Sequence, residues 1–203
     1  GLNTQGFAGY SPNVLDEGLA TDNIKIVLPN AGAITTLTAD RTVNSLNMQA
    51  GTGSTDDSTL DLGGFTLTLA SGGLILSPVS TTALDIDMAV LNGNLTAGTT
   101  AAPADLYLHA QTWLNSQADN TGNADVRIGA NIVDNGAGGS VTLVIGASVG
   151  KGTLLSTNDL YLNGSNTYTG GTFVNTGQVR LNNPSADGST TFTVPGDLTI
   201  TGG

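Results

Sequence analysis

The chain has 203 residues, a formal net charge of −11 and no cysteine, so it can form one sizeable domain but no disulfide framework. Only 10% of its residues are charged, and this low charge density is not typical of a disordered chain. The five lysines and arginines are spread along the sequence, and no run approaches the roughly 18 apolar residues of a membrane span. Nucleic-acid partners and direct insertion into a membrane are therefore not expected.

Residues 1–22 are predicted to form an irregular lead-in segment, in which FAGYSPNVL gives a partial cap for the first strand. From residue 23 to residue 203, short runs with apolar residues at every second position predict strands. These runs cover residues 23–28, 35–49, 58–69, 73–77, 83–97, 104–110, 124–134, 140–147, 158–164, 177–183 and 196–203. The glycine doublets at 63–64 and 72–73 predict sharp corners with positive φ between neighbouring strands.

Two architectures fit these strands. An antiparallel sandwich needs hairpin turns, and Asn92-Gly93 offers a site for one. A parallel solenoid needs phrases that recur at a coil-like spacing. Strand patterns that begin with an aspartate recur at Asp105, Asp125, Asp159 and Asp197. This recurrence favours a solenoid, with about ten coils and a rise of about 50 Å.

The stretch NGSNTYTGGTFVNTGQVRLNN, residues 163–183, contains no charged residue except Arg180 and mixes Asn and Thr with strand-forming residues. Together with the strand that begins at Leu160, it resembles the autotransporter-associated β-strand repeat, also called the passenger-associated transport repeat, of bacterial surface proteins. The matching residues are Gly164, Asn166, Thr167, Tyr168, Thr169, Gly170, Gly171, Thr172, Val174, Asn175 and Gly177. The specific match spans residues 160–181, and a looser resemblance extends over most of the chain.

The resemblance implies an all-β fold, a right-handed parallel β-helix, in a protein that is exported and displayed on a bacterial surface. In such a stack the side chains of successive coils lie about 4.8 Å apart, so Asn and Thr ladders satisfy one another's polar groups. We therefore expect a non-enzymatic structural segment, a stalk, fibre or adhesin scaffold, that needs no cofactor. A glycan-binding adhesin module and a polysaccharide-degrading enzyme are the alternatives.

Several aspartates have two interpretations. Carboxylates close in sequence can supply the hard oxygen ligands that Ca²⁺ prefers, but the repeated nonapeptide pattern of Ca²⁺-binding solenoids is absent, so solvated loop acids are favoured over a metal site. The candidates are Asp56, Asp57, Asp61, Asp85 and Asp87. The aspartates that precede predicted strands, Asp105 among them, have a sufficient structural role in bonds to the backbone.

The remaining candidates are a lone histidine and a few aromatic residues. His109 and Trp113 are each the only residue of their type, and core or corner packing is favoured for both. The side chains of Tyr107, Tyr161 and Tyr168 could stack on sugars, although the first two could equally form an internal ladder. For an enzyme, the nearest approach to a catalytic pair is Asp125 with Arg127.

The end of the sequence, GDLTITGG, reads as a strand and a glycine corner that open a new coil. An open coil exposes unpaired backbone groups over an apolar core. We therefore expect Gly203 to be a truncation, and the last coil to stack on further coils of the same chain or on a neighbouring copy.

Overall fold

The computed structural model describes residues 10, 14–28, 34–50, 58–77, 88–112, 126–146, 148–149, 160–176, 179–180 and 194–201, and the statements below concern these residues. A short 3-10 helix, η2, spans Leu15–Glu17. The strands are β1 Asn23–Leu28, β2 Ile34–Thr36, β3 Arg41–Ala50, β4 Ser58–Asp61, β5 Thr66–Ser77, β6 Met88–Leu91, β7 Asn94–Ala97, β8 Ala104–Thr112, β9 Val126–Ile128, β10 Asn131–Ile132, β11 Val141–Gly146, β12 Ser148–Val149, β13 Leu160–Leu162, β14 Thr172–Thr176, β15 Val179–Arg180 and β16 Leu198–Ile200. Among the described residues no helix is long and apolar enough to cross a membrane.

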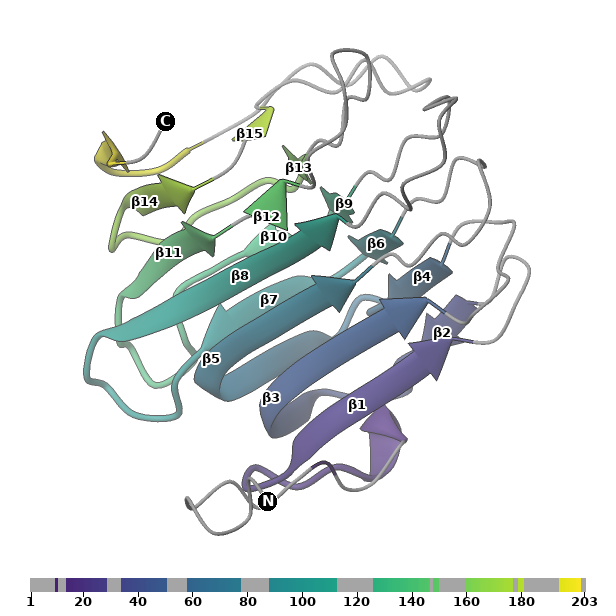
Figure 1. Ribbon diagram of the computed structural model, residues 1–203. Helices are drawn as coiled ribbons and strands as arrows, with labels where there is room; N and C mark the ends of the chain where they lie inside the picture. Colours follow the sequence, from purple (N-terminus) through teal and green to yellow (C-terminus); the bar gives the residue numbers. More distant parts are fainter. Residues whose placement is uncertain are drawn as a thin grey trace, which may run out of the picture.

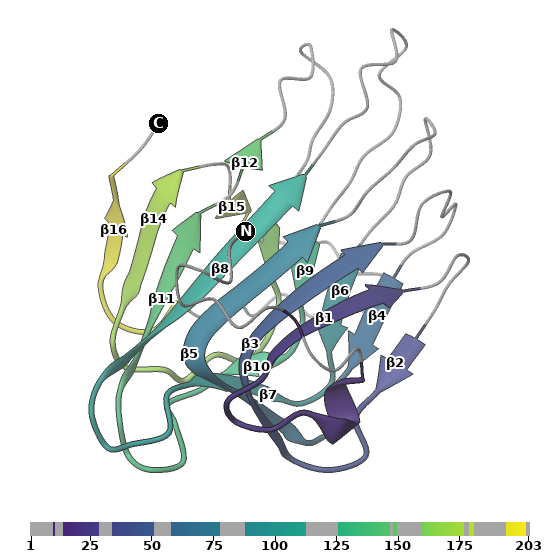
Figure 2. The same cartoon turned by 60° about the horizontal axis from the view of Figure 1, so that its bottom comes forward.

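The chain winds into a parallel β-helix whose strands form two open sheets (Figure 1). The longer sheet has the order β1-β3-β5-β8-β11-β14-β16, and the shorter sheet has the order β2-β4-β6-β9-β13-β15. All the described strand pairs, from β1 with β3 to β14 with β16, are parallel. The chain passes from one sheet to the other and back in a right-handed sense (Figures 1 and 2). The predicted parallel β-helix is thus confirmed, and the antiparallel sandwich is wrong.

The core is built from columns of aliphatic side chains that run along the axis. Strands such as β1 and β11 alternate between buried and more exposed residues, and the register places their buried residues on apolar residues of the neighbouring coil. One column contains Ile24, Leu46, Leu74, Leu108, Ile145 and Val174, all between 0% and 6% exposed. Burial of one such side chain contributes about 1.5–3 kcal/mol to the free energy of unfolding.

The coils differ in length, which changes the expected dimensions. Asn23 pairs with Ser45 in the next coil, whereas Ala104 pairs with Val141. The aspartate spacing therefore did not measure a coil, because Asp105 lies in β8 of the longer sheet and Asp125 directly precedes β9 of the shorter one. Seven strands follow one another along the path of the longer sheet, so the described stack rises about 30 Å rather than the expected 50 Å.

Glycines and one asparagine make the corners, with one difference from the prediction. Gly63 and Gly64 adopt positive φ values of 59° and 86° between β4 and β5, as expected. Gly72, at 76°, does not separate two strands but lies in a bulge within β5. The bulge divides β5, since its first half pairs with β7 and its second half with β8. Asn92, with a φ of 56°, helps to turn the chain from β6 to β7, which do not pair, so the site that the antiparallel alternative would use for a hairpin is a corner.

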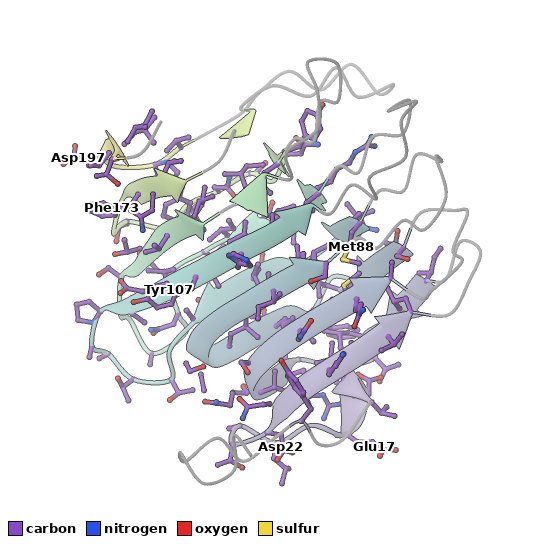
Figure 3. All side chains as sticks on the ribbon, in the orientation of Figure 1. Glu17, Asp22, Met88, Tyr107, Phe173 and Asp197 are labelled. Atoms are coloured by element: carbon purple, nitrogen blue, oxygen red, sulfur yellow. The ribbon has the colours of Figure 1, made fainter. Side chains whose placement is uncertain are left out.

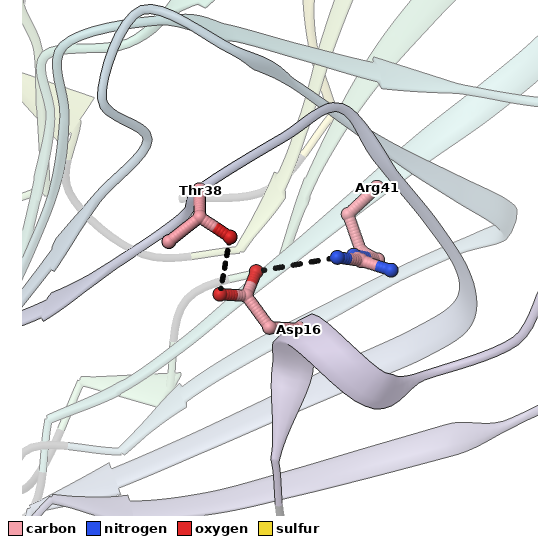
Figure 4. A network of polar contacts seen from close by, with 3 residues as sticks. All are labelled: Asp16, Thr38 and Arg41. Atoms are coloured by element: carbon pink, nitrogen blue, oxygen red, sulfur yellow. Dashed lines mark hydrogen bonds and ion pairs between the residues drawn. The ribbon is translucent and has the colours of Figure 1, made fainter.

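The segment before β1 packs on the first coils. Leu15 of η2 is 2% exposed and belongs to the core cluster. The carboxylate of Asp16 accepts a hydrogen bond of 3.0 Å from the Thr38 hydroxyl and lies 3.6 Å from the Arg41 guanidinium (Figure 4). These contacts hold η2 on the corner between β2 and β3.

Candidate functional site

The repeat-like segment 164–176 comprises the corner from β13 to β14 and the strand β14, and its corner lies directly on the preceding coil. The Ser165 amide donates to Oδ1 of Asn131 over 2.8 Å, the Thr167 amide to the Ile132 carbonyl over 2.9 Å, and the Gly170 amide to the Val141 carbonyl over 2.9 Å. The segment is therefore polar because its corner bonds to the coil below.

Asn166 and Asn131 satisfy backbone groups of neighbouring coils. Oδ1 of Asn166, a buried residue, accepts a hydrogen bond of 2.9 Å from the Ile132 amide. One coil earlier, Asn131 pairs with Asn94 and donates from Nδ2 to its Oδ1 over 3.4 Å. The expected stacking of Asn on Asn thus occurs between Asn94 and Asn131, while the motif asparagine bonds to the backbone.

The motif glycines permit this close stacking. A Cβ added to Gly164 would overlap the carbonyl oxygen of Ala130, and one added to Gly170 would lie 2.6 Å from the carbonyl oxygen of Val141. Gly171 has a φ of 84°, which favours glycine, and its carbonyl accepts the Leu143 amide. Each of these positions therefore excludes a larger side chain for a structural reason.

Tyr168 is a core residue and not a sugar platform. Its side chain is 0% exposed, and its hydroxyl is hydrogen-bonded to Oγ1 of buried Thr172. Burial raises the pKa of the Tyr168 phenol, and the hydrogen bond with Thr172 opposes part of that increase. The prediction that Tyr168 could stack on a sugar is wrong, because the ring fills the interior of the corner.

Asp134, which the sequence analysis did not single out, joins two coils. Its Oδ1 accepts the amides of Val141 and Thr169 at 2.8 and 2.9 Å, and its Oδ2 accepts the Thr169 hydroxyl at 2.8 Å. Burial by itself raises the pKa of this carboxyl, but the three hydrogen bonds outweigh it, so the pKa lies below the usual value of 3.8. Asp134 and Thr169 are far apart in sequence, so local pattern gave no signal for the contact.

The last motif residues complete the link to the next coil. Val174 belongs to the core column, and exposed Asn175 accepts a hydrogen bond of 3.0 Å from the Thr201 hydroxyl. Gly177 lies outside the described residues. The described residues of the motif thus have structural roles. They stack the corner on the preceding coil and link β14 to the next strand.

A second arrangement lies on the outer face of the longer sheet. Tyr107 of β8 pairs with Val144 of β11, which pairs with Phe173 of β14, so these three outward-facing residues form one row, here called the outer aromatic row. Tyr107 is 48% exposed, Phe173 is 40% exposed, and Val144 is partly buried. Figure 3 shows Tyr107 and Phe173 on the strands β8 and β14, with β11 between them.

The Tyr107 ring is held in place by its neighbour on the same strand. Its hydroxyl donates a hydrogen bond of 2.8 Å to Oδ2 of Asp105. This hydrogen bond and the repulsion between a phenolate and the Asp105 carboxylate raise the pKa of Tyr107, with a smaller contribution from burial. Asp105 was predicted to precede a strand and to bond to the backbone. It is instead the second residue of β8, and its carboxylate accepts the hydrogen bond from Tyr107. Asp197 does directly precede β16, as predicted.

The lone histidine is placed differently from the prediction. His109 is exposed on the outer face of β8, beside Ile75 of β5, because it is two residues after Tyr107 on the same face of the strand. The prediction of core or corner packing is therefore wrong for His109. Trp113 lies outside the described residues.

Of the candidate calcium ligands, only Asp61 lies within the described residues. Oδ1 of Asp61 accepts the Gly63 amide over 2.8 Å, which is a local turn contact. Asp56, Asp57, Asp85 and Asp87 lie outside the described residues. Within the described ranges no group of three or more His, Asp or Glu side chains is placed to hold a metal ion.

The candidate catalytic pair is only half described. Arg127 lies on β9 with its guanidinium carbon 5.9 Å from the centre of the Tyr161 ring on β13, and the two residues are in register. Asp125 lies outside the described residues, as does Asp159. Tyr161 is partly buried and contacts Arg127, so it is not part of an internal ladder.

No protein-family model, no curated protein and no solved structure matches this chain.

Proposed function

We propose that this chain is a non-enzymatic structural segment of a large secreted or surface-displayed bacterial protein, in which it serves as a stalk, fibre or adhesin scaffold. The observation that carries the proposal is the continuous parallel stack of seven strands in the longer sheet. The hydrogen bonds between coils run along the axis, so bending or stretching the stack strains several of them at once. The resemblance of residues 160–181 to a repeat of bacterial surface proteins supports the same role.

The last strand of the longer sheet supports growth of the stack. Leu198 and Ile200 pair with Thr172 and Val174, which are 2% and 6% exposed, so they occupy core-facing positions. Nevertheless they are 45% and 67% exposed. A strand edge that carries uncovered core positions is a template for another strand. The proposed partners are further coils of the same chain or neighbouring copies placed end to end.

Electron microscopy and sedimentation of the 203-residue chain test this proposal. We expect rods that associate end to end as the concentration rises, because association buries Leu198 and Ile200. The double variant Leu198→Lys/Ile200→Lys should remain monomeric, since two charges cannot enter an apolar core. His109→Lys is the matched control, because His109 is exposed on the outer face of β8, an internal strand of the same sheet. A wild-type chain that stays monomeric at every concentration would contradict end-to-end growth.

The proposed location and the absence of catalysis are tested separately. Protease treatment of intact cells of the source bacterium should remove the segment, as detected by an antibody raised against it. Protection of the segment in intact cells would contradict surface display. No release of reducing ends is expected from neutral or acidic polysaccharides, and turnover that disappears in Asp125→Asn would instead favour the enzyme.

A further inference from the structure

We propose that the outer aromatic row is a binding platform for an uncharged, extended glycan whose chain runs along the solenoid axis. The proposal goes beyond the scaffold role, which would be served by any outer surface. It rests on the register that aligns Tyr107, Val144 and Phe173 on three adjacent strands, and on the exposure of both rings.

The spacing of the rings fits an extended sugar chain. Tyr107 and Phe173 are separated by one strand, β11, so their backbones lie about 9.6 Å apart along the axis, about the rise of two sugar units in an extended chain. Val144 lies between them and is smaller than either ring, so a flat ligand can span the row. Aromatic faces bind the apolar faces of sugar rings, while the edges of both partners stay in water.

One of the two rings, Tyr107, is oriented by a neighbour on its own strand. The hydrogen bond from Tyr107 to Asp105, two residues earlier on the same face of β8, holds the phenol ring along the strand. The position beside Tyr107 on β5 is Gly73, which has no side chain that could cover the ring. A ring that already has a hydrogen-bonded partner loses less conformational freedom on binding than a ring without one, and this favours affinity.

The surroundings of the row suit hydroxyl groups and repel anions. Exposed Asp105 and His109 flank Tyr107 on β8, and exposed Asn175 follows Phe173 on the outer face of β14. Carboxylate, imidazole and amide groups can all exchange hydrogen bonds with sugar hydroxyls. The nearest charge on β8 is the Asp105 carboxylate, and the chain carries a net charge of −11, so acidic glycans are repelled. This charge commits the ligand class to neutral glycans.

A protein partner fits the row less well. The backbone edges of β11 are already paired with β8 and β14, so an extended peptide cannot add a strand there. A stable protein interface buries about 800 Å² on each partner, far more than three side chains provide. The small row with polar neighbours is therefore assigned to a sugar chain.

The test uses the 203-residue chain and calorimetric titration with two neutral series, cello-oligosaccharides and manno-oligosaccharides, from disaccharide to hexasaccharide. Polygalacturonate oligomers are the acidic comparison. We expect at least one neutral series to bind, with affinity rising by about tenfold or more between disaccharide and tetrasaccharide, because only the longer ligand reaches both rings. Phe173→Ala should abolish this dependence on length, and Tyr107→Ala should do the same. Val27→Ala, a change of another exposed apolar residue on the same sheet, should bind as the wild type does.

Thermal melting of each variant separates binding from folding. The proposal expects both ring variants to melt within a few degrees of the wild type while they lose the length dependence. Binding that is unchanged in both ring variants would overturn the proposal, and so would binding restricted to polygalacturonate or the absence of binding to both neutral series. None of these outcomes affects the end-to-end association of the rods, which is measured on different residues.

Discussion

The two halves of the longer sheet share one interior but differ on their outer faces. In the first strands, Oδ1 of Asn23 accepts hydrogen bonds of 2.7 Å from both Asn44 and Ser45 of the next coil. The outward row that begins at Asn23 on β1 continues along the sheet. It contains Tyr107 on β8, Val144 on β11 and Phe173 on β14. The first half thus joins two neighbouring coils through Asn23 on its outer face, whereas the second half presents Tyr107 and Phe173 to solvent. The core column of Ile24, Leu46, Leu74, Leu108 and Ile145 passes through both halves without interruption.

This difference shows that the stack is set by its interior. Because side chains alternate between the two faces of each strand, the outward positions are free to vary while the inward positions must stay apolar and similar in size. Outward side chains that hydrogen-bond across coils, such as Asn23 with Ser45, stabilise the folded chain. A row of exposed rings can instead bind another molecule. The two rows are therefore expected to respond differently to mutation.

The largest expected effect comes from the shared interior. Leu108→Ala removes a side chain that is 1% exposed, so it should lower the free energy of unfolding by about 2–5 kcal/mol and the Tm by about 10 °C. His109→Ala is the matched control, since His109 is the next residue and faces solvent, and it should change stability by less than about 0.5 kcal/mol. Equal effects of the two changes in chemical denaturation would mean that the inner and outer faces of β8 are misassigned.

The second-largest loss of stability is expected from mutation of Asp134 at the corner. Asp134→Ala leaves the amides of Val141 and Thr169 and the Thr169 hydroxyl without their acceptor, at a cost of about 1–3 kcal/mol. Because the pKa of Asp134 in the folded chain lies below 3.8, the stabilisation is fully present above pH 3.8 and is lost as the pH falls through the folded pKa. Urea titrations between about pH 6 and about pH 3 should show a smaller loss of stability on acidification in Asp134→Asn than in the wild type. Identical pH profiles would show that the carboxylate makes no net contribution.

The polar row in the first half should be worth less. Asn23→Ala removes the acceptor of two hydrogen bonds at partly buried positions, so we expect a loss of about 1 kcal/mol. A double-mutant cycle with Ser45→Ala should give a coupling of at least about 0.5 kcal/mol, because the two residues share a bond. Gln49→Ala is the control, because Gln49 occupies an outward position of β3, the strand that also contains Ser45. Additive effects of Asn23→Ala and Ser45→Ala would show that the hydrogen bond between these residues does not stabilise the first half of the sheet.

The ring row in the second half should contribute least to folding. Phe173→Ser removes an exposed side chain and one cross-strand pair, so the loss of stability should be about 0.2–1 kcal/mol. Val174→Ser, at the adjacent buried position, should cost more, because it places a hydroxyl in the core column. If thermal melting gave a larger loss for Phe173→Ser, the row would be a folding element and not a free surface.

Calcium removal should have the smallest effect. Within the described residues no acidic cluster is placed to hold a metal ion, and Asp61 is engaged by the Gly63 amide. We therefore expect a chelator to change the Tm by less than about 4 °C, which corresponds to about 1 kcal/mol for a chain of this size. A larger fall would point to the aspartates at 56, 57, 85 and 87 as ligands.

The sequence by itself determined the local structure. Alternation of apolar and polar residues has a period of two, so it locates strands and divides their residues into inward and outward sets. The strand at 23–28 and the glycine corner at 63–64 followed directly from such local signals. The recurring aspartate phrases also favoured parallel coils over hairpins, although they did not give the length of a coil.

Only the tertiary structure decided which residues meet across coils. Coils of unequal length set the register, so no fixed spacing in the sequence could align Tyr107 with Phe173 or bring Asp134 to Thr169. The same register places Tyr168 in the interior and His109 on the outer face. It also makes the predicted strands on either side of Gly72 one strand, β5. The physical reason is that strand alternation depends on neighbours within the chain, whereas register depends on where the next coil finds a complementary core surface.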